Sequence, residues 1–389
     1  MINTRRVIIV SYFIYLFLLM IFSYTQVDLN LTLSSQNFYQ QIQQKLIYIG
    51  YFQRPLSTFI LFLLIFFSFF FLGFFNYCYK KKILNFNIIK SLILITGICL
   101  LFSYPMFSHD LFNYIFDARI FTKYGLNPYE LRALNFPQDD WIRFMHWTHR
   151  TNPYPLLWTI YSFIPSFLGL QIFIPTIVLF KFFVGFLPYI LACWFIYKIA
   201  DKLFSSKKEE ILIYFAFSPI VIFDTLINAH NDVLMMVFAL LAFYFLIKQK
   251  KFLAFLLLLI SVFFKYATVV LFPIFLIKEI VKNISRKKLI LGLNLALFLI
   301  IIFYSLKNEF QSWYLLWSLP FFVFLIDNFF WKMLGFFLQI AFLFFYLPYF
   351  YFGEWGFSIK STKIIILLVT LLIFSSYVLF TKIAHKDRT

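Results

Sequence analysis

Carboxylate and imidazole side chains gather in one segment of a chain that is otherwise apolar almost throughout. The segment runs from Tyr104 to Pro155 and contains 5 of the 16 acidic residues. In a sequence that is 63% hydrophobic, such a concentration of titratable groups indicates the place where chemistry happens. The other residues must then hold this segment in position.

The start of the segment predicts a short helix with carboxylates on one face. Ser108 can cap this helix, and Asp110 in its first turn is favoured by the helix dipole. At 3.6 residues per turn, Asp110, Asn113 and Asp117 line the same face, and Tyr114 joins them. The simpler interpretation is a surface helix whose acidic groups are only solvated.

Two carboxylates on one helix face can divide the work of a reaction. One can act as a general base on a hydroxyl group, with a pKa raised by apolar surroundings. The other can hold a divalent cation such as Mg²⁺ or Mn²⁺, or can hydrogen-bond a sugar. Asp110 is closer to the end of the preceding apolar run, so its position is better fixed and we assign it as the base. Asp117 is the second candidate.

The far end of the segment adds two histidines and a guanidinium group. His146, His149 and Arg150 can complete a metal site with one of the two carboxylates. They can also bind a phosphate or a sugar, or cap the loop. His109 and Asn127 are further candidates for sugar or acceptor binding, and Asn127 lies in a predicted turn.

Two later patches place polar groups between apolar runs. In residues 228–232, Asn231 or Asp232 can cap the next helix, but capping explains one of these groups and not His230 as well. Lys265 stands in an apolar stretch, where an ammonium group is costly unless it meets an anion. That anion can be a phosphate or an internal carboxylate.

The aromatic patch that begins with Gln311 and Trp313 stands at the start of another apolar run. Its Trp and Tyr side chains can form part of the aromatic belt that marks a membrane interface. They can also stack on the face of a sugar ring. Both interpretations stay open at the level of the sequence.

The composition makes the scaffold a membrane protein. A mean hydropathy of +0.87 and 24% aromatic residues exclude an ordinary soluble domain. The net charge is +18, but the basic residues cluster in short loops between apolar runs. This is the positive-inside pattern and not a nucleic-acid-binding surface. The 3 cysteines lie in or beside apolar runs, so we expect no disulfide framework and no thiolate-rich metal site.

Placing the basic loops in the cytoplasm predicts an all-α, polytopic transmembrane bundle of about 12 spans. The expected spans cover residues 7–24, 55–76, 88–105, 173–200, 210–227, 233–248, 252–264, 267–278, 287–305, 313–326, 330–350 and 362–380. Both termini, including the basic tail 386–388, then lie in the cytoplasm. Residues 106–172 form one large extracytoplasmic loop with interfacial helices, and residues 156–171 are re-entrant or interfacial.

This topology has two consequences for the site. The helix that begins near Asp110 is expected to lie along the membrane surface, with Arg119 pointing away from the carboxylates toward lipid headgroups. The reaction is expected on the extracytoplasmic side of the membrane. ATP and nucleotide sugars are not available on that side. This inference restricts the donor more than any single motif does.

Four patches, in their order along the chain, resemble the polyprenol-phosphate-sugar-dependent membrane glycosyltransferases of the C superfamily. The bacterial α-mannosyltransferase branch is the part of that superfamily that they resemble most. The patches are Ser108–Arg119 followed by Gly125–Tyr129, then residues 228–232, 264–268 and 311–317. In that superfamily an Asp of the first large extracytoplasmic loop is the catalytic acid/base, which the resemblance maps onto Asp110, with Asp117 second. Here the loop follows the third expected span, so residues 1–80 look like an added N-terminal helix pair and 81–389 like the catalytic module.

The resemblance implies transfer of a sugar, mannose in that branch, from a polyprenyl phosphate to a hydroxyl of a lipid-linked or cell-envelope glycan. The acceptor attacks the anomeric carbon with inversion, Asp110 takes the proton, and the leaving phosphate needs a cation. The candidates for that cation are Lys265, Arg150 and His230. The expected sugar and acceptor contacts are His109, Asn113, Tyr114, Asn127, His146, His149, Asn231, Asp232, Gln311 and Trp313.

The alternative class is a flippase or secondary transporter of lipid-linked sugars in the bacterial cytoplasmic membrane. Transporters usually have repeated halves and polar sites at the membrane midplane. This sequence has no visible repeat, and its acidic residues gather in a loop. A noncatalytic membrane scaffold is disfavoured by the same concentration of titratable groups. The enzyme is therefore the preferred interpretation.

Overall fold

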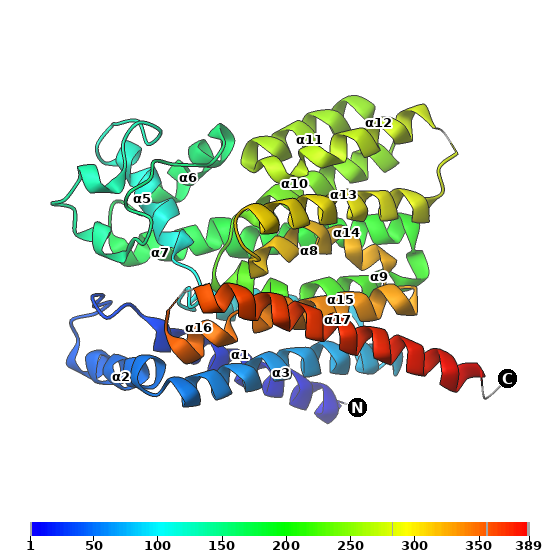
Figure 1. Cartoon of the computed structure of the whole chain (residues 1–389), viewed down its shortest axis with the longest axis horizontal. Helices are drawn as coiled ribbons and strands as arrows, with labels where there is room; N and C mark the ends of the chain where they lie inside the picture. The colour runs from blue at the N-terminus through cyan, green and yellow to red at the C-terminus, as the bar shows by residue number, and fades with distance from the viewer. Residues whose placement is uncertain (1, 282, 355–356, 387–389) are drawn as a thin grey trace.

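The apolar runs fold as helices because a helix satisfies its own backbone hydrogen bonds where water is absent. The computed structural model describes residues 2–281, 283–354 and 357–386, and every regular element in these ranges is a helix (Figure 1). The end of the basic tail, residues 387–389, lies outside them. The α-helices are α1 (Ile2–Ser23), α2 (Asn37–Ile47), α3 (Arg54–Lys80), α4 (Phe86–Leu101), α5 (Asp110–Thr122), α6 (Leu156–Leu168), α7 (Phe173–Phe180), α8 (Leu187–Leu203), α9 (Lys208–Ala216), α10 (Asp232–Ile247), α11 (Lys251–Phe264), α12 (Phe272–Ile280), α13 (Arg286–Lys307), α14 (Leu315–Phe322), α15 (Phe329–Phe344), α16 (Leu347–Phe352) and α17 (Phe357–Lys386).

Shorter helical segments connect or extend these elements. The 3₁₀ segments are η1 (Tyr24–Gln26), η3 (Ala133–Asn135), η4 (Asp140–Phe144), η6 (Ser205–Lys207), η8 (Tyr266–Leu271), η9 (Ser312–Tyr314) and η10 (Val323–Leu325). The π-helical segments are η2 (Tyr48–Phe52), η5 (Lys181–Phe186) and η7 (Val221–Ile227). The predicted all-α class is confirmed for the part of the chain that the structure describes.

The long helices run along the longest axis of the molecule and give it two distinct ends (Figure 1). Both chain termini and the connection between α12 and α13 lie at one end. The opposite end carries α2, α5, α6 and the irregular chain between α5 and α6. The segment that the sequence singled out is therefore collected at one end of the bundle, away from the termini.

Among the residues that the structure describes, six helices are long and apolar enough to cross a membrane, and a bent pair brings the number to seven. The six are Thr4–Gln26, Arg54–Lys80, Phe173–Leu203, Arg286–Lys307, Phe329–Phe352 and Ile359–Thr381. The bent pair is Ser205–Ala216 with Val221–Ile227, which meet at 61°. These helices fit a membrane protein, whereas the expected count of about 12 spans is not reached by helices of this length.

The helix α6 presents its apolar side chains outward. Leu156, Ile160 and Ile164 are exposed on one face, whereas Trp158 and Ser162 are buried on the other. With 13 residues, α6 is shorter than the roughly 20 residues that a full crossing needs. The expectation that residues 156–171 are re-entrant or interfacial stays a prediction, and the outward apolar face fits both forms.

Candidate active site

A buried lysine fixes the point where the chain leaves α4 and approaches α5. Lys181 donates hydrogen bonds from Nζ to the carbonyl oxygen of Leu100 at 3.0 Å, and to the carbonyl and hydroxyl oxygens of Ser103. These bonds pair carbonyl oxygens at the C-terminal end of α4 that have no partner within the helix. Four residues further on, the backbone N–H of Phe107 donates to Oδ1 of Asn228 at 3.1 Å. The segment that leads to Asp110 is therefore held by hydrogen bonds to both Lys181 and Asn228.

The helix α5 begins at Asp110, which stands in its first turn as the sequence predicted. Residues 111–120 are all buried, so the alternative of a surface helix with merely solvated acids is wrong, whereas the expected position along the membrane surface stays a prediction. His109 occupies the N-cap position without a capping hydrogen bond from its side chain, whereas the hydroxyl of Ser108, the predicted cap, accepts a hydrogen bond from the Asp110 backbone N–H at 3.2 Å. The negative charge of Asp110 still stands in the first turn, where the helix dipole favours it.

The guanidinium group of Arg119 is also buried, which corrects the expectation that it reaches lipid headgroups. Its Nε donates to Asp139 at 2.8 Å, and the group stacks 3.7 Å from the ring centroid of Trp141. Lys123 and Tyr124 donate to the same carboxylate. Burial alone would raise the pKa of Asp139, but these hydrogen bonds hold it below its ordinary value. This pairing anchors the chain after α5.

The connection from η7 to α10 is built around a second buried carboxylate. Asp224 accepts hydrogen bonds from Asn228 at 3.0 Å, Ser312 at 2.7 Å and Tyr346 at 2.6 Å. The backbone N–H of His230 donates to the Asp224 carbonyl oxygen at 3.1 Å. These bonds join three distant parts of the chain, so Asp224 is a positioning residue that holds the connection with His230 in a fixed shape.

Asp110 and His230 bring two of the predicted patches into contact. Oδ2 of Asp110 lies 3.5 Å from Nδ1 of His230, whose side chain is fully buried. On its other side, the imidazole stacks on the ring of Trp313 with centroids 4.1 Å apart. Trp313 thus contacts His230, and its expected contact with the sugar or acceptor stays a prediction. The carboxylate and the imidazole can therefore exchange a proton or orient one another.

Lys265 meets an internal carboxylate. Its Nζ lies 2.7 Å from Oδ1 of Asp232 and 3.2 Å from Oδ1 of Asn231, and it stands over the ring of Trp317. The indole N–H of Trp317 donates to the same oxygen of Asp232. Of the two anions that the sequence allowed for Lys265, the structure brings an Asp to it.

Several buried polar atoms at this place have no hydrogen-bond partner among the described residues. They include both side-chain atoms of Asn113, Nε2 of His230, Nδ2 of Asn231 and Oδ2 of Asp232. Buried polar atoms of a folded protein are normally paired, and those left over mark places where a ligand or water supplies the bond. Burial raises the pKa of Tyr114 well above its ordinary value, and the nearby charges of Asp110 and Asp232 add to the rise.

Asp117 lies about two turns further along α5 and belongs to a different neighbourhood. Burial raises the pKa of Asp117 to about 7, and the positive charge of Arg150 opposes that rise. Arg150 itself stands over the ring of Trp147 at 5.1 Å and has no ion pair within the described ranges. Asp117 is therefore influenced by the charge of Arg150 without forming an ion pair with it, whereas Asp110 lies in contact with His230.

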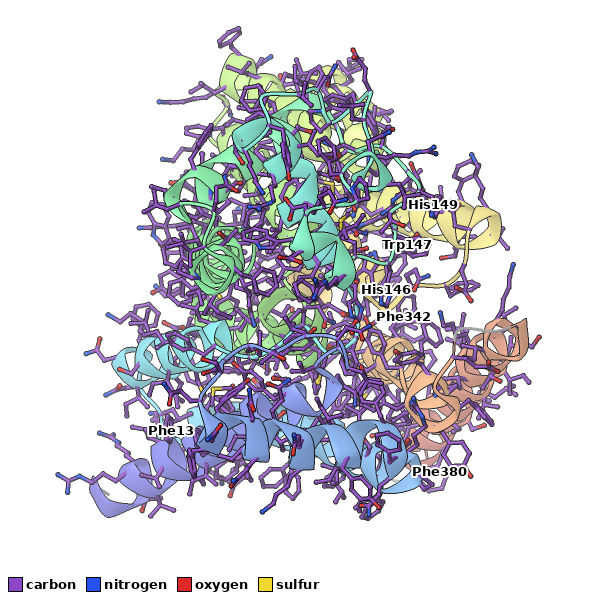
Figure 2. All side chains as sticks on the ribbon, turned by 90° about the vertical axis from the view of Figure 1, so that its left-hand side faces the viewer. Phe13, His146, Trp147, His149, Phe342 and Phe380 are labelled. Carbon is purple, nitrogen blue, oxygen red and sulfur yellow. The ribbon has the colours of Figure 1, made fainter. Side chains whose placement is uncertain are left out.

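Three predicted residues lie apart from these groups. Asn127 donates to Glu130 and accepts from the backbone of Tyr129, which is the predicted turn at the surface. Gln311 donates to Glu309 at 3.3 Å. Figure 2, which looks onto the end with α5, shows His149 on the same loop as His146 and Trp147, and the His149 ring contacts that of Trp147. The structure does not bring these three side chains to Asp110.

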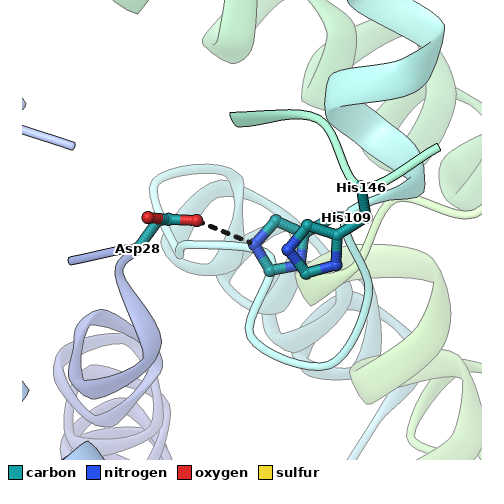
Figure 3. A group of neighbouring side chains, drawn as sticks. All are labelled: Asp28, His109 and His146. Carbon is teal, nitrogen blue, oxygen red and sulfur yellow. Dashed lines mark ion pairs between the residues drawn. The ribbon is translucent and has the colours of Figure 1, made fainter. Parts of the chain in front are cut away.

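His109 and His146 meet each other and a residue that the sequence reasoning missed, Asp28 (Figure 3). Their rings stack with centroids 3.7 Å apart, and Nε2 of His109 lies 3.9 Å from Oδ2 of Asp28. Within the described ranges this is the one group of three side chains able to hold a metal ion. Neither Asp110 nor Asp117 joins this group, so of the possibilities named for His146 and His149, a metal site completed by one of these two carboxylates is not seen among the described residues.

Some of the missed residues had a signal in the sequence. Asp28 is the sole acidic residue before Asp110. Asp224 stood out as a buried acid in an apolar run, but nothing identified Ser312 and Tyr346 as its donors. Trp317 lay inside the aromatic patch. Their roles depend on contacts between distant segments, which spacing along the chain does not reveal.

One comparison with known protein families decides what kind of protein carries this site. The family model described as alpha-(1->6)-mannopyranosyltransferase, N-terminal domain, matches residues 33–280, which is more than half of the chain. The chain belongs to this family. It is a mannosyltransferase of the C superfamily, and the resemblance stated from the four patches is confirmed. No curated protein and no solved structure matches it.

Membership gives the coarse chemistry of the protein. A mannosyltransferase takes a sugar donor and a glycan acceptor, and the family together with the six apolar helices fits a membrane enzyme. The matched range contains Asp110, Asp117, residues 228–232 and Lys265, whereas Trp313 lies beyond it. The expected boundary between residues 80 and 81 stays a prediction.

Proposed function

We propose that the protein transfers mannose from a polyprenyl-phosphate donor to a hydroxyl of a lipid-linked or cell-envelope glycan, with Asp110 as the base. The observation that carries this proposal is the position of Asp110. It stands at the start of a buried helix, 3.5 Å from His230 and near side chains with unpartnered polar atoms. An acceptor hydroxyl at this place gives its proton to Asp110 as it attacks the anomeric carbon of the donor.

The leaving phosphate requires a positive charge. The three candidate side chains, Lys265, His230 and Arg150, differ in the contacts that they already make. Lys265 is neutralised by Asp232 at 2.7 Å, whereas His230 lies 3.5 Å from Asp110 and neither of its ring nitrogens has a hydrogen-bond partner among the described residues. Arg150 has the Trp147 ring beneath it and no ion pair within the described ranges. We assign the donor phosphate first to Arg150, whose planar donors suit two phosphate oxygens. Lys265 then orients Asn231 and Asp232 toward the sugar.

The proposed side of the membrane follows from the two ends of the bundle. We propose that the end with both termini faces the cytoplasm and that the end with α5 and α6 faces outward. Four of the shorter apolar helices, Phe86–Leu101, Asp232–Ile247, Lys251–Phe264 and Ser312–Leu325, lie where the sequence expects spans, as do η8 and α12. Together with the six long helices and the bent pair, they bring the count to the predicted number of about 12.

The stereochemistry is a further part of the proposal. The family is described by an α-(1→6) linkage, which we extend to this protein as the linkage of its product. A single displacement inverts the anomeric centre, so an α-linked product requires a β-linked donor. The site has one base at the reacting hydroxyl and no second carboxylate assigned as a nucleophile, which suits a single displacement.

The test is transfer by the purified protein from defined donors. Radiolabelled polyprenyl phosphate mannose, glucose and arabinose are incubated with the protein and membrane lipids, with and without a chelator. We expect mannose to be transferred from the β-linked donor to a lipid-linked acceptor. An α-mannosidase should then release the labelled mannose from the product. Retention of the donor configuration would exclude the single displacement. Movement of the intact donor lipid across the bilayer without transfer would favour the flippase.

A further inference from the structure

Three segments from distant parts of the chain converge beside the start of α5. Asp28 belongs to the connection between η1 and α2, His109 occupies the N-cap position of α5, and His146 follows η4 (Figure 3). Possible ligand atoms of all three side chains lie within 4.8 Å of one another. Asp28 precedes the range that matches the family, whereas both histidines lie inside it.

One imidazole nitrogen of this group is buried without a partner. Nε2 of His109 has no hydrogen bond among the described residues, and the Asp28 carboxylate, at 3.9 Å, is beyond hydrogen-bond distance. Imidazole nitrogens and carboxylate oxygens are ligands of divalent metal ions, and a buried polar atom of a folded protein normally has a partner. The geometry therefore leaves this nitrogen available to an ion.

We propose that Asp28, His109 and His146 form a site for a divalent transition-metal ion of the Zn²⁺ class. Two imidazoles and one carboxylate suit zinc, whereas Mg²⁺ prefers oxygen ligands alone. In a tetrahedral zinc site with bonds of about 2.0–2.1 Å, neighbouring ligand atoms stand roughly 3.4 Å apart. The carboxylate and the first imidazole, at 3.9 Å, are already close to that separation.

One side-chain movement completes the site. The rings of His109 and His146 are nearly parallel, with 19° between their planes, so their lone pairs do not yet converge. His146 is exposed, so its ring can turn out of the stack toward the other two ligands. Three protein ligands leave a fourth position for a water molecule or a substrate oxygen.

The proposed ion would tie the N-terminal helices to the reaction centre. It joins the connection after α1 to the residue directly before Asp110, and also to the loop that leads to Arg150. Its role in the enzyme is positional, because none of its ligands is the proposed base. The inference goes beyond the proposed function and does not depend on the donor or acceptor.

Metal binding by the full-length protein in detergent tests the proposal. The protein is prepared with a non-histidine affinity tag and stripped with a chelator. Zinc content after dialysis, zinc affinity in competition with a chromophoric chelator, and the visible spectrum of the Co²⁺-loaded protein are then measured. We expect about one zinc ion per chain, a Co²⁺ spectrum of a low-coordinate site, and no competition from Mg²⁺.

Three variants identify the ligands. Asp28→Asn and His146→Gln should each weaken zinc binding by at least about tenfold, since even a second-shell change commonly costs that much. His149→Gln, three residues away and in contact with Trp147, should leave it unchanged. Unfolding temperatures in chelator separate loss of a ligand from loss of the fold.

Three results would overturn the proposal. One is substoichiometric zinc in the wild type, and another is equal affinity in the wild type and in both ligand variants. The third is an equal loss in His149→Gln. If a ligand variant fails to fold, the Co²⁺ spectrum of the wild type decides alone. Transfer activity that survives loss of zinc would leave the proposed function intact, and zinc binding without transfer would leave the metal site intact.

Discussion

Oδ2 of Asp110 lies 3.5 Å from Nδ1 of His230, and the two residues come from separate patches of the sequence. Different hydrogen bonds hold Asp110 and His230 in position. Asp110 follows a segment fixed by Lys181 and Asn228, whereas His230 follows a segment fixed by Asp224. Because Asn228 also donates to Asp224, a single network sets the distance between the base and its imidazole partner.

Replacing Asp110 with Asn should remove the base while it keeps the size of the side chain. We expect kcat for mannose transfer to fall by about 10²- to 10⁴-fold, because general base catalysis commonly contributes that much. Binding of the donor lipid should change little. Asp140→Asn, an exposed carboxylate paired with Arg143, is the matched control and should keep full activity. Wild-type kcat in Asp110→Asn would reassign the base to another residue.

His230 should act as a positioning residue for Asp110 and not as a binding residue for the donor. His230→Phe keeps the stacking on Trp313 but removes both ring nitrogens, so kcat should fall by about tenfold or more with little change in KM. His230→Gln restores a polar atom and should recover part of the rate. Steady-state kinetics of the two variants check this. A rise in KM without loss of kcat would place His230 at the donor instead.

The helix that carries the base could be predicted from the sequence, and its surroundings could not. The apolar runs, the start of α5 at Asp110 and the four patches follow from periodicity and from residue types. The partners of the charged groups follow from tertiary contacts. Arg119 therefore appeared suited to the lipid headgroups, although Asp139 of the same loop binds it. For Asp28, the sequence offered only one weak indication, namely that it is the sole acidic residue before Asp110.

The ion pair of Asp232 and Lys265 should stabilise the folded protein more than either charged side chain does without its partner. Lys265→Met leaves the Asp232 carboxylate buried without its cation, which should cost about 3–5 kcal/mol of stability. The double variant Lys265→Met with Asp232→Asn should cost clearly less, since no charge is left unpaired. Thermal unfolding in detergent measures both. Additive losses in the double variant would mean that the two charges do not depend on one another.

Arg150 should contribute to binding of the donor phosphate. Arg150→Ala removes hydrogen bonds from a charged group, which contribute about 1.5–3 kcal/mol to binding. The KM for the donor should therefore rise by about 10- to 100-fold. Arg150→Lys should recover part of this loss, because it keeps the charge without the planar fork. Arg143→Ala, an exposed arginine of the same loop, is the control and should keep the wild-type KM. An unchanged KM in Arg150→Ala would move the phosphate to Lys265.

Asp117 should make the stability of the enzyme fall as the pH rises. Its pKa in the folded protein is about 7, above the ordinary value of 3.8, because burial disfavours the charged form. Between these two values the folded state keeps a proton that the unfolded state has lost, so stability decreases with pH across that window and levels off above it. The shift corresponds to a cost on the order of 4 kcal/mol for the ionised form. Asp117→Asn should remove this dependence, so that its unfolding temperature rises relative to that of the wild type as the pH increases from 5 to 8. Thermal unfolding at a series of pH values checks the prediction, and parallel curves for the two proteins would contradict it.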